Sequence, residues 1–135
     1  MRIFFDTNVL ASGLMGRGLC RDLLDRVILE HTVLLGVPVR EELHRVLTSK
    51  FHVPTDLWNQ LALRLDEFES APGTTVVPDT FVSDPDDVPI LACAIAAKAD
   101  IFVTGDKALL ETGIVAGMPV LSPRELWQKL TGSNP

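Results

Sequence analysis

The sequence predicts an α/β fold, a three-layer sandwich in which helices cover both faces of a central parallel five-stranded sheet. Short apolar segments alternate along the chain with longer segments of helical periodicity, which is typical of repeated strand–helix units. The first segment, Ile3 to Phe5, is apolar at every position, as expected for a strand buried on both faces. With this strand at the centre, right-handed crossovers favour the strand order 3-2-1-4-5.

The individual elements follow from local signals in the sequence. A loop is expected at residues 11–18, because glycines occupy positions 13, 16 and 18. Pro38 suits the first turn of one helix, and Ser122 with Glu125 forms a capping box that opens the last helix. The expected strands are residues 3–5, 32–36, 74–77, 101–103 and 119–121, and the expected helices are residues 19–29, 37–48, 55–69, 86–98, 107–111 and 123–130.

Composition indicates a single domain at residues 1–130, followed by a C-terminal tail at 131–135. Hydrophobic residues make up 47% and charged residues 22%, which is ordinary for a soluble protein. No apolar stretch approaches the length of a membrane span, and Asp6 interrupts any early signal-peptide region. Cys20 and Cys93 lack metal-type spacing, so we expect free thiols in a cytoplasmic protein.

The net charge of −6 bears on the kind of partner. An acidic chain is poorly suited to broad, nonspecific binding of nucleic acid, because the phosphates repel it. A nuclease remains compatible with this charge, since its site needs carboxylates to hold cations.

Two acids stand where neighbouring strands end. Asp6 follows the first strand, and Asp106 follows the fourth. In the expected order these strands lie about 4.8 Å apart, with the topological switch of the sheet between them. Ligands of open α/β sheets bind at this edge, so both carboxylates should meet in one cleft. The simpler alternative is that Asp6, Thr7 or Asn8 caps a following helix.

Helical phase selects among the other acids. On the helix at 37–48, Glu42 borders the buried stripe, whereas Glu41 points away from it. Asp87 begins the buried side of the helix at 86–98, at its amino-terminal end. Two further aspartates lie in or just before that first turn and could simply cap it: Asp84 and Asp86.

Four acids are therefore expected to converge from four elements: Asp6, Glu42, Asp87 and Asp106. Clustered carboxylates repel one another unless cations neutralise them. Hard oxygen ligands suit Mg²⁺ or Mn²⁺ rather than zinc, and His31, His44 and His52 are too scattered to compete. No Walker motif and no Ser/His/Asp triad is apparent.

Four motifs, in this order, resemble the PIN-domain ribonucleases, and most closely the VapC-like toxins of toxin–antitoxin modules. They are FDTNVL at 5–10, EELHRVL at 41–47, DPDDVPILA at 84–92 and VTGD at 103–106. The resemblance covers nearly the whole chain. One departure is Val37, which stands where the family commonly has a serine before the proline of the second helix.

The resemblance implies a role for each matched residue. Asp6, Glu42, Asp87 and Asp106 would bind the metal, with Asp84 as a secondary ligand because three aspartates compete for the third place. Hydrogen bonds from Asn8 and Thr104 would support these carboxylates.

The expected reaction is hydrolysis of an RNA phosphodiester, in which one or two Mg²⁺ or Mn²⁺ ions activate water and stabilise charge. Five cationic residues could steer the phosphate backbone, although each is more often a solvated surface charge: Arg17, Arg21, Arg40, Arg45 and Lys107. One alternative is a catalytically silent RNA- or protein-binding domain. Another is a phosphatase or phosphotransferase that uses Asp6 as its nucleophile.

The high apolar content also predicts protein partners. One small core cannot hide all of these side chains, so an apolar patch is expected on the helices at 19–29 and 55–69, near Trp58. The resemblance implies that this surface forms a homodimer. The resemblance further implies an antitoxin whose arginine enters the carboxylate cluster and displaces the metal.

Overall fold

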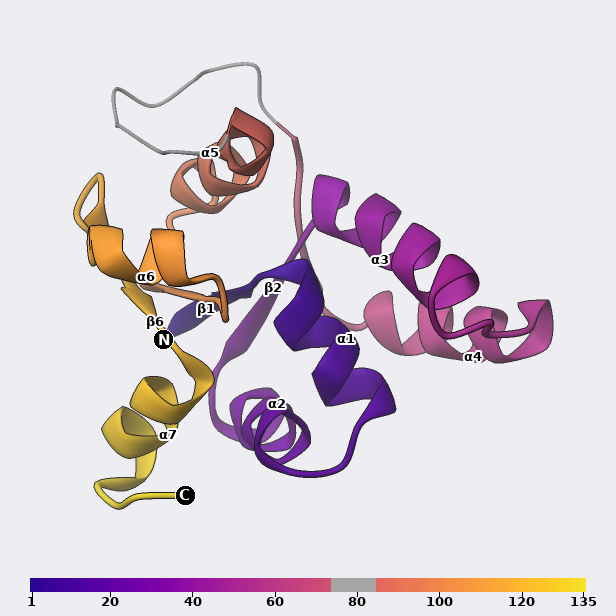
Figure 1. The fold of residues 1–135 in the computed structure, drawn as a ribbon, viewed down its shortest axis with the longest axis horizontal. Helices are drawn as coiled ribbons and strands as arrows, with labels where there is room; N and C mark the ends of the chain where they lie inside the picture. Colours follow the sequence, from indigo (N-terminus) through magenta and orange to yellow (C-terminus); the bar gives the residue numbers. More distant parts are fainter. Residues whose placement is uncertain (74–84) are drawn as a thin grey trace.

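A sheet of six strands runs through the centre of the computed structural model, which describes residues 1–73 and 85–135 (Figure 1). The strand order is β3-β2-β1-β4-β6-β5. All neighbouring pairs are parallel except β5 and β6, which pair antiparallel. The strands are β1 (Arg2–Phe5), β2 (Thr32–Gly36), β3 (Glu69–Ala71), β4 (Ile101–Val103), β5 (Ile114–Val115) and β6 (Met118–Leu121).

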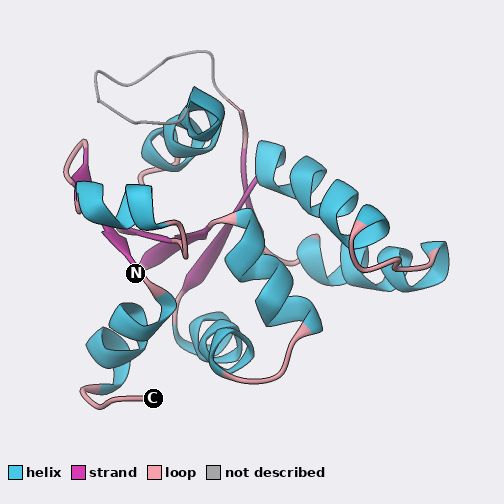
Figure 2. Cartoon of the chain, in the orientation of Figure 1, coloured by secondary structure: helices cyan, strands magenta, loops and turns pink. Residues whose placement is uncertain are grey.

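Helices lie on both sides of this sheet, which confirms the three-layer α/β architecture (Figure 2). In the view of Figure 1, α5 and α6 lie above the strands, and α2 and α7 lie below them. The helices are α1 (Thr7–Met15), α2 (Leu19–Glu30), α3 (Val37–Ser49), α4 (Thr55–Leu65), α5 (Val88–Ala96), α6 (Lys107–Thr112) and α7 (Pro123–Thr131), and a short 3-10 turn, η1 (Pro85–Asp87), precedes α5.

The apolar β1 strand is central, as its sequence predicts. Ile3, Phe4 and Phe5 are at most 1% exposed, and the strand pairs with β2 on one side and β4 on the other. The rings of Phe4 and Phe102 stack across the β1–β4 pair with their centroids 5.5 Å apart. This packing places the carboxyl ends of β1 and β4 side by side.

The predicted strand order needs two corrections at the edges of the sheet. The strand beside β2 is β3 at Glu69–Ala71, and the segment expected to form it, 74–77, lies outside the described residues. Consequently α4 ends at Leu65 instead of continuing to Glu69. At the other edge, β6 corresponds to the strand predicted to be last. The structure adds a further strand beside it, β5, which pairs antiparallel and has only two residues, too few to show periodicity in the sequence.

The prediction of a loop at residues 11–18 is also wrong, because α1 extends to Met15. Asp6 caps the start of this helix through the Thr7 N–H. Gly13 lies inside the helix, where an added Cβ would come within 3.0 Å of Leu24 Cδ2 and 3.1 Å of the Cys20 carbonyl oxygen. This glycine therefore allows α1 to pack closely on α2, and the helix ends only at Gly16.

Two other expectations agree with the structure. Cys20 and Cys93 are free cysteines. Ser122 and Glu125 form the predicted capping box, although α7 continues to Thr131, one residue into the expected tail. Within residues 1–73 and 85–135, no helix has the length and apolarity that crossing a membrane would require.

Gly36, at the end of β2, supports a prediction about the core. An added Cβ would lie 2.7 Å from Phe4 Cζ and 3.2 Å from Cys93 Sγ, so one of these buried side chains must shift. We expect Gly36→Ala to lower the free energy of unfolding by about 1–3 kcal/mol, as overpacking does. Urea denaturation measures the change. Gly105→Ala is the control, because nothing lies within 4 Å of its added Cβ; equal losses in both variants would contradict the packing argument.

Candidate active site

Asp6 links the central strand to the first helix. Its backbone N–H donates to the Val103 carbonyl oxygen at 2.9 Å, which joins the ends of β1 and β4. Its Oδ1 accepts a hydrogen bond from the Thr7 N–H at 2.8 Å and so caps α1. Asp6 therefore does cap a helix, as the simpler alternative proposed, and this cap holds its carboxylate at the carboxyl edge of the sheet.

Thr104 connects the two acids that follow β1 and β4. It is fully buried, and its hydroxyl donates to Asp6 Oδ2 at 2.7 Å. The Thr104 Oγ1 also accepts a hydrogen bond from the Asp106 N–H at 3.1 Å. Asp106 Oδ1 in turn accepts from the N–H groups of Ala108 and Leu109, at 2.8 and 3.2 Å, and caps α6. One buried hydroxyl thus sets the relative placement of Asp6 and Asp106.

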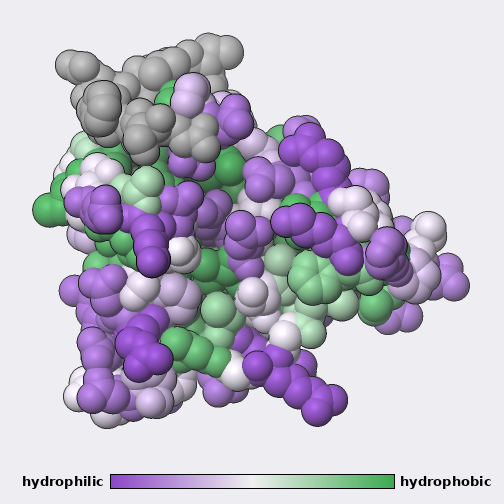
Figure 3. Space-filling model, viewed as in Figure 1, coloured by the Kyte–Doolittle hydropathy of each residue, from purple (hydrophilic) through white to green (hydrophobic). Residues whose placement is uncertain are grey.

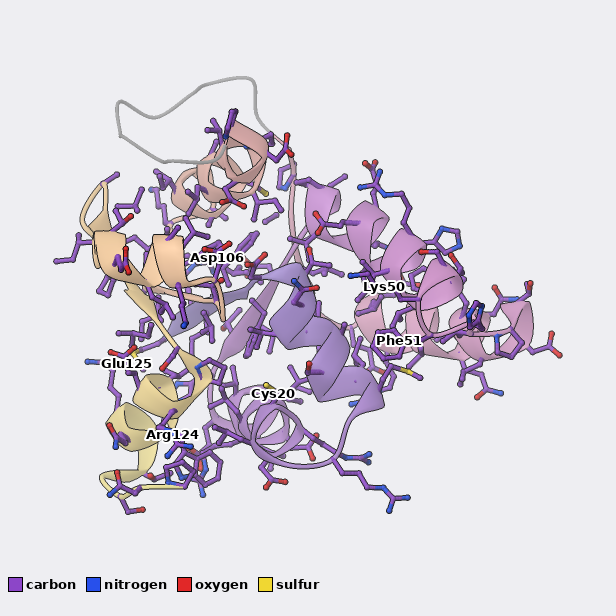
Figure 4. All side chains as sticks on the ribbon, in the orientation of Figure 1. Cys20, Lys50, Phe51, Asp106, Arg124 and Glu125 are labelled. Carbon is purple, nitrogen blue, oxygen red and sulfur yellow. The ribbon has the colours of Figure 1, made fainter. Side chains whose placement is uncertain are left out.

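A cleft of about 840 Å³ opens above these residues. In the view of Figures 3 and 4, it lies near the middle of the molecule, where polar residues surround a hollow and Asp106 lies beside α6. Among the described residues, five acids from four places in the sequence line it, together with one arginine, Arg45. The acids are Asp6, Glu42, Asp86, Asp87 and Asp106.

The two glutamates of α3 differ as helical phase predicts. Glu42 is half-buried and lines the cleft. Glu41 is exposed and is not among the lining residues. The buried residues of this helix, Val39, Leu43 and Leu47, fix its rotation and hence the side from which each acid projects.

Of the remaining candidate site residues, the structure places three in the cleft and does not describe the fourth. Asp87 ends η1, is half-buried and lines the cleft, as does the exposed Asn8 on α1. Asp86, which the sequence left as a helix cap or a competitor for the third ligand place, lines the same cleft because the 3-10 turn carries both aspartates toward it. Asp84, the secondary candidate, lies outside the described residues.

Burial and charge act together on Asp6. Loss of solvent raises the pKa of its carboxyl above the ordinary value, and the nearby negative charge of Asp106 raises the pKa further. The hydrogen bonds from Thr104 and Thr7 oppose this shift without cancelling it. A positive ion at this position would relieve the cost of a carboxylate that is held charged beside a second one.

The acids line a shared cleft without forming a closed cage. Across residues 1–73 and 85–135, no three Asp, Glu, His or Cys side chains are arranged to hold a metal ion together. Mg²⁺ retains several waters and binds proteins through only one or two carboxylates, so the donors present fit such an ion. They do not fit a dehydrated zinc site, which needs about four close protein ligands.

The five candidate cations are not equivalent. Arg45, one turn after Glu42 on α3, lines the cleft. Arg40 instead forms an ion pair with Asp66 at 2.7 Å. The others are exposed and do not line the cleft: Arg17, Arg21 and Lys107. Sequence reasoning did not anticipate Ser12 and Cys20, which also line it, because their approach depends on how α1 packs on α2.

Comparison with known proteins adds a family and a fold. The PIN domain matches residues 2–108. Among solved structures, the chain is similar to the one described as the crystal structure of VapBC2 from Rickettsia felis bound to a DNA fragment from their promoter, with a TM-score of 0.62 and 15% identity over 90% of this chain and 98% of that chain. At that identity the likeness shows the fold alone. No curated protein matches the sequence.

Proposed function

The chain belongs to the PIN-domain family, and from this premise we propose that it is a metal-dependent ribonuclease, the toxin of a VapC-like toxin–antitoxin module. PIN domains are generally nucleases. The observation that carries the proposal is the acidic cleft at the carboxyl edge of the sheet, where Asp6 and Asp106 are joined through Thr104.

The proposed cofactor is Mg²⁺ or Mn²⁺. Asp6, Glu42, Asp87 and Asp106 would hold it, one or two of them directly and the others through the waters that the ion retains, with Asp84 as a further candidate ligand. When bound, the ion supplies Lewis acidity, activating water and stabilising charge on the attacked phosphate. Thr104 orients the Asp6 carboxylate through the hydrogen bond that its hydroxyl donates to Oδ2. Arg45 offers a positive charge to the RNA phosphates at the cleft wall.

The test of this function is incubation with mixed RNAs, with and without Mn²⁺, followed by mapping of the cut ends. We expect cleavage only with the metal. RNA that binds without being cut would instead support a catalytically silent domain. A trapped aspartyl-phosphate on Asp6 would support the phosphatase alternative.

Metal binding should also appear in thermal stability. A ligand that binds only the folded chain raises the melting temperature. We expect millimolar Mg²⁺ or Mn²⁺ to raise it by several degrees, and by less in Asp6→Asn and Asp106→Asn. Differential scanning fluorimetry measures these shifts. An identical rise in wild type and both variants would mean that the ion binds elsewhere.

The proposal includes two protein partners. One solved structure that resembles this chain is described as VapBC2, which supports an antitoxin as one partner. A homodimer is supported by apolar side chains on two outer helix faces, since Leu29 on α2 is 84% exposed and Leu63 on α4 is 70% exposed. Light scattering across a concentration series tests the dimer, and a chain that stays monomeric throughout would contradict it.

A further inference from the structure

A smaller hollow of about 330 Å³ adjoins the acidic cleft, and we call it the side pocket. Ser12 on α1 and Cys20 on α2 line both hollows, so the two lie side by side. Met15, Leu19 and Phe51 give the side pocket an apolar lining. In Figure 4, Cys20 lies between α1 and α2, and Phe51 lies beyond the end of α3 on the same face of the molecule as Asp106.

Phe51 is the distinctive residue of this pocket. Its side chain is 52% exposed, and it does not belong to the hydrophobic core. The backbone holds it there: His52 has a φ of 51°, and the Val53 N–H donates to the Leu47 carbonyl oxygen at 3.0 Å. The chain therefore keeps an aromatic ring accessible at a defined place.

Positive charge accompanies the ring. Arg17 lines the side pocket, Arg45 lines the adjoining cleft, and Lys50 is exposed next to Phe51. Among residues 1–73 and 85–135, none of these three forms an ion pair, and the arginines that do are Arg2, Arg26 and Arg40. In a chain of net charge −6, this is a local concentration of available cations.

We propose that the side pocket is a base-binding subsite for single-stranded RNA. Phe51 stacks on an unpaired base, and Arg17 and Arg45 contact phosphates between that base and the acidic cleft. An aromatic ring beside cations is the usual means of binding single strands, because every base has a stacking face. Bases in a duplex are already stacked and paired, so the subsite selects single-stranded substrate.

The spacing of the two hollows suits an RNA strand. The α1 helix leads from Asp6 at its start to Gly16 at its end, a rise of about 15 Å for ten residues. A strand that places one phosphate at Asp6 and one base at Phe51 therefore runs along α1 for several nucleotides. The inference rests on the proposed ribonuclease function and deepens it by assigning a base-binding subsite beside the acidic cleft.

Binding and cleavage of a single-stranded RNA oligonucleotide test this subsite. Anisotropy of the fluorescently labelled probe is measured on the Asp106→Asn chain, which should not cut it, and KM and kcat are measured on the unmodified chain with Mn²⁺. We expect Phe51→Ala to raise Kd and KM about tenfold with little change in kcat, and Phe51→Trp to preserve both. Ile114→Ala is the matched control, because Ile114 is 62% exposed and lines neither hollow.

Three outcomes would overturn the subsite. One is unchanged Kd and KM in Phe51→Ala. A second is Phe51→Leu binding RNA as tightly as the unmodified chain, which would mean that the pocket needs only an apolar side chain and suits a protein partner. A third is no binding of the probe. Binding that depends on Phe51 in a chain that never cuts RNA would support the subsite and contradict the proposed function, so the two failures are distinguishable.

Discussion

Asparagine in place of Asp6 is expected to reduce metal-dependent RNA cleavage by a factor of about 100 to 1,000, the loss of several kcal/mol of charge stabilisation. The amide keeps the size of the carboxylate. Its oxygen can still accept from the Thr7 N–H, and its NH₂ group can donate to the Thr104 hydroxyl oxygen, so the geometry of the β1 and β4 ends should persist. Single-turnover cleavage of an RNA oligonucleotide in Mn²⁺ measures the effect. Activity near the wild-type level would exclude Asp6 from the metal site.

The same variant should be more stable than the wild type when divalent ions are absent. Folding raises the pKa of the Asp6 carboxyl. Below the ordinary aspartate pKa this carboxyl is protonated in both the folded and the unfolded chain and costs no stability. The free energy of unfolding then falls as the pH rises through the folded pKa, because the folded chain must hold a buried charge. The asparagine variant carries no such charge. The gain in stability should therefore be largest near neutral pH and vanish below about pH 3.9. A gain that grows on acidification would show that burial is not the dominant influence on Asp6.

The second large effect concerns two adjacent glutamates. Glu42→Gln is expected to lower kcat/KM by at least about tenfold, because Glu42 lines the cleft. Glu41→Gln should change it less than about twofold, because the exposed Glu41 projects away from the cleft. Both substitutions remove one charge from the same turn of α3, so each is the control for the other. Equal losses would mean that net charge, and not position, governs cleavage.

Residues whose placement depends on local pattern could be predicted from the sequence. The apolar run Ile3 to Phe5 was sufficient to identify a central strand, because no exposed strand tolerates apolar side chains on both faces. The orientation of Glu42 followed from the periodicity of one helix. Neighbouring β1 and β4 followed from the handedness of crossovers, which is nearly invariant.

Features set by contacts between distant segments could not be predicted. Gly13 looked like a loop residue, since its role depends on Leu24 and Cys20 of the next helix. β3 carries the exposed Glu69 and Ser70, and only pairing with β2 identifies it as an edge strand. Asp86 looked like a helix cap because nothing local distinguishes a capping carboxylate from one that faces a cleft.

The hydrogen bond between Thr104 and Asp6 spans 98 positions of sequence, and this separation has a consequence for how the protein is made. Chains are synthesised at about 5–20 residues per second, so Asp6 is polymerised about 5–20 s before Asp106 joins it. Until β4 arrives, β1 lacks one neighbour and the cleft lacks one wall. A nascent or prematurely terminated chain shorter than this point would therefore have no complete acidic site, and the proposed cleavage of RNA would have to wait until β4 and Asp106 have been made.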